Sequence, residues 1–147
     1  MKGLNVRVYG ILIHENKLLV SDEYIKGMKI TKLPGGGLEF GEGTHDCLKR
    51  EFKEELDLDV EIESHFYTTD FFVNSAFSRA NQLISIYYIV KSKQDFNFKT
   101  SNKPFDFKKL EEGAQSMRWI EIPTLSENDF TFIIDKRVGE LLINNSL

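Results

Sequence analysis

The order of strand-like and helix-like segments in this chain predicts an α/β fold, with a mixed β-sheet covered by helices on both faces as in an α/β/α sandwich. Two observations lead to this prediction. Segments typical of strands outnumber those typical of helices, and the clearest helix lies between strands along the chain. With 147 residues, the chain is long enough to build one hydrophobic core. We therefore expect a single domain over residues 1–147.

The chain begins with two apolar segments typical of strands, Val6–His14 and Lys17–Tyr24. The dipeptide Glu15-Asn16 between them predicts a hairpin turn. A loop is expected over Lys26–Lys29 because it contains a glycine. A run of glycines follows, and Gly37–Phe40 is expected to form a short strand before the first helix.

The clearest helix is predicted over His45–Leu56, a segment without glycine or proline. Thr44 precedes it and is expected to be the N-cap. Leu48, Phe52 and Leu56 recur at every fourth position and form one apolar stripe. We expect this stripe to pack against the sheet.

The second half of the chain contains further strands and a closing helix. Asp59–Phe72 and Gln82–Lys91 have strand patterns, and the second of these is apolar on both faces, which favours a central position in a sheet. Lys93–Glu112 has a mixed composition and is expected to be either a substrate loop or the continuation of a strand followed by a loop. Ser116–Ile122 reads as a strand, and Ile133–Ile143 has helical spacing.

Three glutamates share one sector of the first predicted helix. Glu51, Glu54 and Glu55 stand at i, i+3 and i+4, so their side chains can converge. Each like-charged i,i+4 pair costs a few tenths of a kcal/mol, and hard oxygen ligands of this kind suit Mg²⁺ or Mn²⁺, which would remove the repulsion. Arg50 lies next to Glu51 and can orient it. On the helix alone, a solvated acidic face is an equal alternative.

The residues around this helix have a characteristic spacing. Five residues separate Gly36 from Glu42, seven more lead to Arg50-Glu51, and Glu54-Glu55 follow after two others. This pattern resembles the signature of the Nudix hydrolase family. One position departs from it, because Asp57 stands where the family has a second glycine. Asp tolerates a left-handed conformation better than most residues, so we expect the change to affect local stability more than chemistry.

The resemblance implies a Nudix fold and a hydrolase that uses divalent cations to cleave the pyrophosphate of a nucleoside diphosphate linked to another moiety. It implies Mg²⁺ as the cofactor, with Mn²⁺ as an alternative. The implied metal ligands are the carboxylates of Glu51, Glu54 and Glu55 and the backbone carbonyl of Gly36. Arg50 would orient Glu51 and so belong, with Glu51 and Glu54, to the catalytic residues. Glu42 would brace the loop.

These residues leave more than one choice for the general base and for the substrate. Glu51 is the first choice for the base, and the loop residues Glu111 and Glu112 are alternatives. A nucleoside triphosphate and a nucleotide sugar such as ADP-ribose both fit as substrates. The alternative function is a catalytically inactive Nudix-like module that senses a nucleotide. Such a module would be expected to have lost some of the acids, whereas Glu51, Glu54 and Glu55 are all present.

The composition of the chain restricts the kinds of partner and the cellular compartment that we expect. A net charge of −4 at pH 7 argues against binding of a nucleic acid polymer, which usually needs a basic face. A small nucleotide is compatible, since a metal supplies local positive charge. Cys47 is the single cysteine and fits a reducing compartment. We find no signal-peptide pattern and no apolar run long enough for a membrane span, so we expect a cytoplasmic protein, for which a homodimer is compatible.

Overall fold

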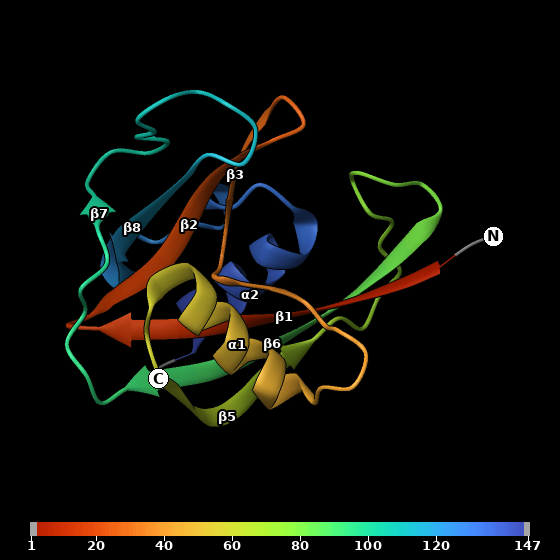
Figure 1. Cartoon of the computed structure of the whole chain (residues 1–147), viewed down its shortest axis with the longest axis horizontal. Helices are drawn as coiled ribbons and strands as arrows, with labels where there is room; N and C mark the ends of the chain where they lie inside the picture. Colours follow the sequence, from red (N-terminus) through yellow and green to blue (C-terminus); the bar gives the residue numbers. More distant parts are fainter. Residues whose placement is uncertain (1–2, 146–147) are drawn as a thin grey trace. The chain divides into compact units, whose positions relative to one another are not determined.

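The computed structural model of the chain describes residues 3–145, which form eight strands, two α-helices and two short 3-10 helices (Figure 1). The elements, in chain order, are β1 (Gly3–His14), β2 (Lys17–Ile25), β3 (Met28–Lys32), β4 (Gly35–Gly37), α1 (Thr44–Leu56), β5 (Val60–Thr68), β6 (Asn81–Ser92), β7 (Thr100–Ser101), β8 (Gln115–Glu121), η1 (Ile122–Thr124), η2 (Glu127–Asp129) and α2 (Ile133–Asn144). Parallel and antiparallel strand pairs both occur. The predicted α/β fold with a mixed sheet is confirmed.

The chain divides into two compact units. The first comprises the described residues up to Leu12 together with Pro34–Phe98, and the second comprises Ile13–Leu33 together with the described residues from Lys99 onward. Strand β1 belongs to both, because its last residues pair with β2 in the second unit. Within the described part of the chain, no helix has the length and apolar composition needed to cross a membrane.

The first unit is built on four strands, with β6 between β5 and β1. The β6–β1 pair is parallel and the β5–β6 pair is antiparallel, so the predicted central position of this strand is confirmed. Strand β4 pairs with β1 on the other side, with Val8 opposite Gly36 and Arg7 opposite Gly37. The expected strand over Gly37–Phe40 is therefore wrong in its bounds, because pairing to β1 selects the glycines themselves.

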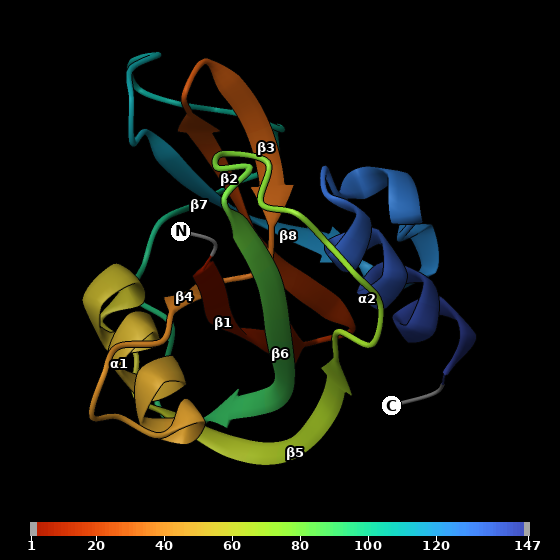
Figure 2. The ribbon, with the colours of Figure 1, turned by 90° about the vertical axis from the view of Figure 1, so that its right-hand side faces the viewer.

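Helix α1 lies beside β4 in Figure 2 and contacts both β4 and β5. Gly43, rather than Thr44, occupies the N-cap position, so the predicted cap is wrong by one residue. The Thr44 hydroxyl instead shares a hydrogen bond of 2.7 Å with the hydroxyl of Tyr88 on β6. The predicted apolar stripe is confirmed, since the buried residues of the helix are Cys47, Leu48, Phe52 and Leu56.

Asp57 ends α1 in the left-handed conformation, with φ 50° and ψ 41°. Its backbone N–H donates to the carbonyl of Lys53 at 3.0 Å, and the N–H of Leu58 donates to the carbonyl of Phe52 at 3.4 Å, which closes the last turn. This conformation costs an ordinary residue roughly 1–2 kcal/mol, whereas glycine adopts it freely. The expectation that Asp57 takes the place of a helix-ending glycine is confirmed.

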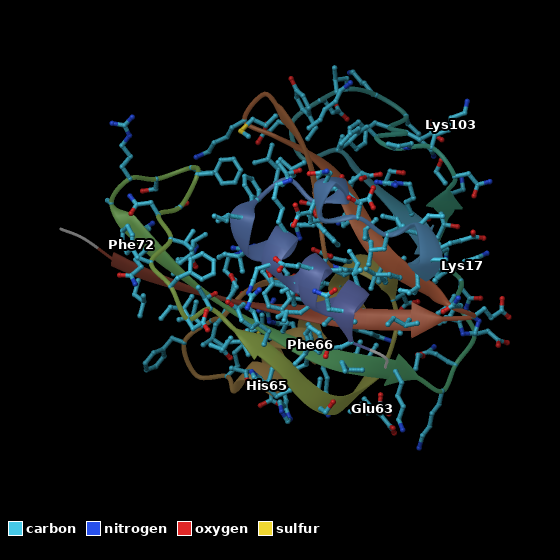
Figure 3. The ribbon with its side chains drawn as sticks, turned by 180° about the vertical axis from the view of Figure 1, so that it is seen from behind. Lys17, Glu63, His65, Phe66, Phe72 and Lys103 are labelled. Carbon is cyan, nitrogen blue, oxygen red and sulfur yellow. The ribbon has the colours of Figure 1, made fainter. Side chains whose placement is uncertain are left out.

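Strand β5 follows and is shorter than the predicted Asp59–Phe72. Its register against β6 shifts at two points, between Ile62 and Ser64 and again between His65 and Tyr67. Glu63 and His65 are exposed and project outward from this strand (Figure 3). Bulges and outward charges of this kind discourage pairing with another strand.

In the second unit, β2 lies between β3 and β8, and β7 pairs with β8. The predicted hairpin turn before β2 is confirmed, because Glu15 and Asn16 both have positive φ, at 49° and 62°, as a two-residue hairpin requires. Helix α2 forms as predicted and packs near η2.

The second unit also encloses a charged side chain, Asp22 of β2, which is fully buried. Its carboxylate accepts hydrogen bonds from Arg118 Nε at 2.9 Å, from the Thr31 hydroxyl at 2.7 Å and from the Phe105 backbone N–H at 3.1 Å. One arginine therefore balances one carboxylate, and both carboxylate oxygens accept bonds from protein donors. A buried charge with such partners is a structural feature of the interior.

Candidate metal centre

All of the residues proposed from the sequence as metal ligands lie in the first unit. Gly36 is in β4 and the three glutamates are on α1, while Glu42, which was expected to brace the loop, lies in the turn between these elements. The backbone turns back at Glu39, whose carbonyl accepts the Glu42 N–H at 3.3 Å. This turn brings the glycine strand and α1 together, because only a few residues separate them.

Arg50 ties this turn to the helix. Its Nε and terminal nitrogens donate to both carboxylate oxygens of Glu42, at 3.0 and 2.7 Å, and one of them also donates to the Gly37 carbonyl at 3.1 Å. The pKa of Glu42 falls from 4.5 to about 2, first because Arg50 donates to it and second because the Glu39 N–H does so. The expectation that Glu42 braces the loop agrees with these bonds.

The remaining nitrogen of the same guanidinium, Nη1, points toward the glutamates of the helix. Arg50 donates to Glu51 at 3.0 Å and to Glu54 at 3.3 Å, and a Glu39 oxygen lies at 3.8 Å. Arg50 thus contacts Glu51, and its role in orienting that side chain stays a prediction. Together with Glu42, four carboxylates lie within 4 Å of one positive charge. The cluster therefore carries an excess of negative charge.

Glu51 lies directly against the backbone of Gly36. A Cβ atom added to Gly36 would stand 2.4 Å from Glu51 Oε1 and 2.5 Å from its Cδ, so a side chain at this position would force the Glu51 carboxylate to move. The Glu51 side chain is largely buried, with 14% of its surface exposed. Glycine at position 36 thus provides the space in which this carboxylate lies.

The remaining carboxylates of the helix differ in exposure. The Glu54 side chain is 59% exposed, whereas Glu55 is half-buried and its Oε2 atom is inaccessible to solvent. Lys53 points elsewhere, because it pairs with Asp57 at 3.1 Å and with Asp59 at 3.5 Å. The nearest lysine in sequence therefore does not neutralise the glutamates.

The carboxylates of α1 and the carbonyl of Gly36 have the chemistry that a divalent cation needs. The absence of a side chain at Gly36 lets the Glu51 carboxylate lie close to that backbone. Carboxylate and carbonyl oxygens are the ligands that Mg²⁺ and Mn²⁺ prefer. Within residues 3–145, however, no three acidic, histidine or cysteine side chains already converge on one point, because Arg50 draws Glu51 and Glu54 toward itself. A bound cation would compete with Arg50 for these two carboxylates.

Cys47 lies beside this cluster and is fully buried. Its thiol donates to the Gly37 carbonyl at 3.5 Å. Burial raises the pKa of the thiol from 9.0 to about 12, and the hydrogen bond to Glu42 adds to this effect. A neutral, buried thiol is a packing group rather than a nucleophile.

The loop candidates for the general base, Glu111 and Glu112, belong to the second unit. Glu112 accepts the Lys26 backbone N–H at 2.7 Å, and Glu111 lies 3.6 Å from Lys109. Both are exposed. Their role as a base stays a prediction.

The Gly37 carbonyl accepts hydrogen bonds from both Arg50 and Cys47, and this role was not predicted from the sequence. The signal available for it was the run of three consecutive glycines, which ends at Gly37. A glycine run signals close backbone approach, but it does not say which side chains approach.

Comparison with known proteins shows the family of the chain and similar folds. The family model of the NUDIX domain matches residues 3–137 of this chain. A NUDIX hydrolase from Nitrosomonas europaea has a similar structure, with a TM-score of 0.69 and 19% sequence identity over 92% of this chain and 86% of that one.

Two further solved structures are similar. The MutT protein from Bacillus halodurans has a TM-score of 0.67 and 15% identity, covering 96% of this chain and 83% of its own. An ADP-ribose pyrophosphatase from Streptococcus suis has a TM-score of 0.61 and 17% identity, covering 94% of this chain and 86% of its own. At these identities, the likeness concerns the fold.

Proposed function

This chain belongs to the NUDIX family, and from that premise we propose that it is a divalent-metal-dependent hydrolase. It cleaves the pyrophosphate of a nucleoside diphosphate linked to another moiety, either a nucleoside triphosphate or a nucleotide sugar of the ADP-ribose type. One observation carries the proposal. The carboxylate of Glu51 lies against the backbone of Gly36, on a helix that carries two further glutamates one turn away.

In this proposal the metal is held by the carboxylates of Glu51, Glu54 and Glu55 and by the carbonyl of Gly36. Mg²⁺ or Mn²⁺ bound there supplies polarisation of phosphate oxygens and a water of lowered pKa. Arg50 orients Glu51 until the cation binds and fixes the helix to the turn through Glu42. Glu51 also accepts the proton of the attacking water, and the loop glutamates of the second unit are the alternatives for that role.

The remaining parts of the proposal rest on composition. A net charge of −4 supports a small nucleotide as the partner rather than a nucleic acid polymer. The NUDIX match over residues 3–137 supports one domain for the chain. A cytoplasmic location is proposed from the single, buried cysteine.

The function is tested by a phosphate-release screen over nucleoside triphosphates, ADP-ribose, dinucleoside polyphosphates and nucleotide sugars, with Mg²⁺ or Mn²⁺. One class should be hydrolysed, and chelation should abolish the release. Glu54→Gln should lower kcat by about 10²–10³-fold, because the metal supplies several kcal/mol of charge stabilisation and each 1.36 kcal/mol is tenfold in rate.

Glu61→Gln is the matched control. Glu61 is an exposed glutamate of β5 in the same unit, and it pairs with Lys93 at 3.0 Å. Its substitution should leave hydrolysis unchanged. Full activity of Glu54→Gln would contradict the ligand assignment. Tight nucleotide binding without turnover of any substrate would favour the alternative, a nucleotide-sensing module.

A further inference from the structure

The ring of Phe52 on α1 rests directly on the backbone of Gly10 in β1. A Cβ atom added to Gly10 would stand 2.5 Å from Cε1 and 2.7 Å from Cζ of that ring, and 3.3 Å from a methyl group of Val90 on β6. Ordinary contacts of a Cβ atom begin at about 3.4 Å. The missing side chain at position 10 therefore allows α1 to approach the sheet this closely.

The ring has little freedom to avoid an added methyl group. Phe52 is 1% exposed and Val90 is 2% exposed, and protein interiors are packed too densely to accept an extra carbon without movement. An aromatic ring is rigid and turns about only two bonds. A side chain at position 10 would therefore be accommodated chiefly by moving α1 away from β1.

The same face of the sheet holds the second close approach to α1. Gly10 stands two residues along β1 from Val8, so both face the same side, and Val8 pairs with Gly36 of β4. Glu51, which lies against Gly36, is followed directly by Phe52, which lies against Gly10. Two consecutive helix residues thus sit on two glycines of adjacent strands, as the course of α1 beside β4 in Figure 2 allows.

We propose that Gly10 is a positioning residue for the metal centre, which it serves through Phe52 by setting the separation between α1 and β4. The inference rests on the proposed function. The ligands come from two elements, three carboxylates from α1 and one carbonyl from β4, so this separation decides whether all four reach one ion. Mg²⁺ demands near-ideal geometry at about 2.0–2.1 Å, and a displacement of about 1 Å can cost 10²-fold in rate.

The test is Gly10→Ala, with Mn²⁺ binding measured in the absence of substrate by electron paramagnetic resonance of the free ion. The affinity for Mn²⁺ should fall by about 10–100-fold, the usual range when a group that supports a ligand is removed. The hydrolysis rate of Gly10→Ala should be closer to the wild-type rate at saturating metal than at low metal, because the substitution weakens metal binding.

Gly139→Ala is the matched control. Gly139 of α2 lies in the second unit, and a Cβ added there would stand 2.8 Å from the ring of Phe130. Both substitutions place a methyl group against a buried phenylalanine and should lower the melting temperature. Only Gly10→Ala should weaken Mn²⁺ binding.

A rescue variant keeps the test valid if Gly10→Ala folds poorly. Phe52→Leu removes ring atoms that the new methyl group would meet, so the Gly10→Ala/Phe52→Leu double variant should bind Mn²⁺ more tightly than Gly10→Ala. Phe52→Leu alone is the reference. Such recovery is a coupling that a purely additive loss of packing would not produce.

Three results would overturn the inference, and they differ in what else they affect. If Gly10→Ala melts earlier but binds Mn²⁺ like the wild type, Gly10 serves packing alone and the proposed function stands. If the double variant binds no better than Gly10→Ala, the effect does not pass through Phe52. If the wild type itself binds no Mn²⁺, the proposed function fails together with the inference.

Discussion

An arginine holds carboxylates in each of the two units, but the balance of charge differs between them. In the second unit, Arg118 pairs with the fully buried Asp22, whose oxygens also accept bonds from Thr31 and Phe105. In the first unit, Arg50 has four carboxylates within 4 Å, one of them on the 59% exposed Glu54. One arrangement is neutral and enclosed, and the other is negative and open on one side.

The difference separates a structural group from a functional one. A buried pair of opposite charges is neutral and needs no further ligand. Removing one partner leaves an uncompensated charge in the interior. An excess of carboxylates is a cost to the fold unless a cation joins them. Stability should therefore depend on the Asp22–Arg118 pair in all conditions, whereas the exposed carboxylate of Glu54 beside Arg50 should add to stability only when metal is present.

The largest expected effect is in the second unit. Asp22→Asn should lower the free energy of unfolding by about 3–5 kcal/mol, because it leaves Arg118 buried without its counter-charge. Urea denaturation measures the loss. Asp95→Asn, at an exposed position, is the control and should change stability by less than about 0.5 kcal/mol. A small loss for Asp22→Asn would remove the contrast between the units.

Magnesium should stabilise the wild type and fail to stabilise a variant that lacks a ligand. At a concentration one hundred times the Kd, binding to the folded state alone contributes about 2.7 kcal/mol. Glu51→Gln should lose most of this gain. Thermal melting with Mg²⁺ and with a chelator measures it, and an equal rise in both proteins would show that the ion binds elsewhere.

Without metal, removing one of the carboxylates around Arg50 should lower the free energy of unfolding only slightly. Glu54→Gln in a chelator should change the free energy of unfolding by no more than a few tenths of a kcal/mol, since a like-charged neighbour is lost along with an exposed contact to Arg50. The unfolding midpoint in urea measures this. A loss above about 1 kcal/mol would mean that the pair with Arg50 is structural, as in the second unit.

The smallest effect concerns pH. The pKa of Glu42 falls from 4.5 to about 2 because Arg50 donates to it, so the carboxylate contributes stability above pH 4.5 that is lost as the pH falls toward 2. The difference in melting temperature between the wild type and Glu42→Gln should be constant from pH 7 to about 5 and shrink below that. A difference that vanishes near pH 6 would contradict the assigned pairing.

Patterns local in sequence predicted much of this molecule. The apolar stripe of α1 and the absence of glycine and proline fixed its extent, and the spacing from Gly36 to Glu55 identified the cluster. Asp57 was expected in a left-handed conformation and adopts it. Such features depend on residues within a few turns of one another, so one sequence suffices to find them.

Features that depend on distant partners were missed. Strand β4 takes its bounds from β1, and Thr44 bonds Tyr88 instead of capping the helix. Gly10 reads only as an interruption in an apolar strand, because nothing nearby in sequence shows that Phe52 will lie on it. Which residues meet across a sheet and a helix is decided by packing, which a linear pattern does not contain.

The burial of Cys47 has a practical consequence for spectroscopy. The chain has one cysteine, and its thiol stays protonated in the folded protein because its pKa is about 12. Maleimide and methanethiosulfonate probes should therefore not react with Cys47. A cysteine introduced at an exposed position would then be the one residue that carries the spin label or fluorophore. Labels at Lys49 and Glu61, both exposed, would report the distance between α1 and β5 as metal is added.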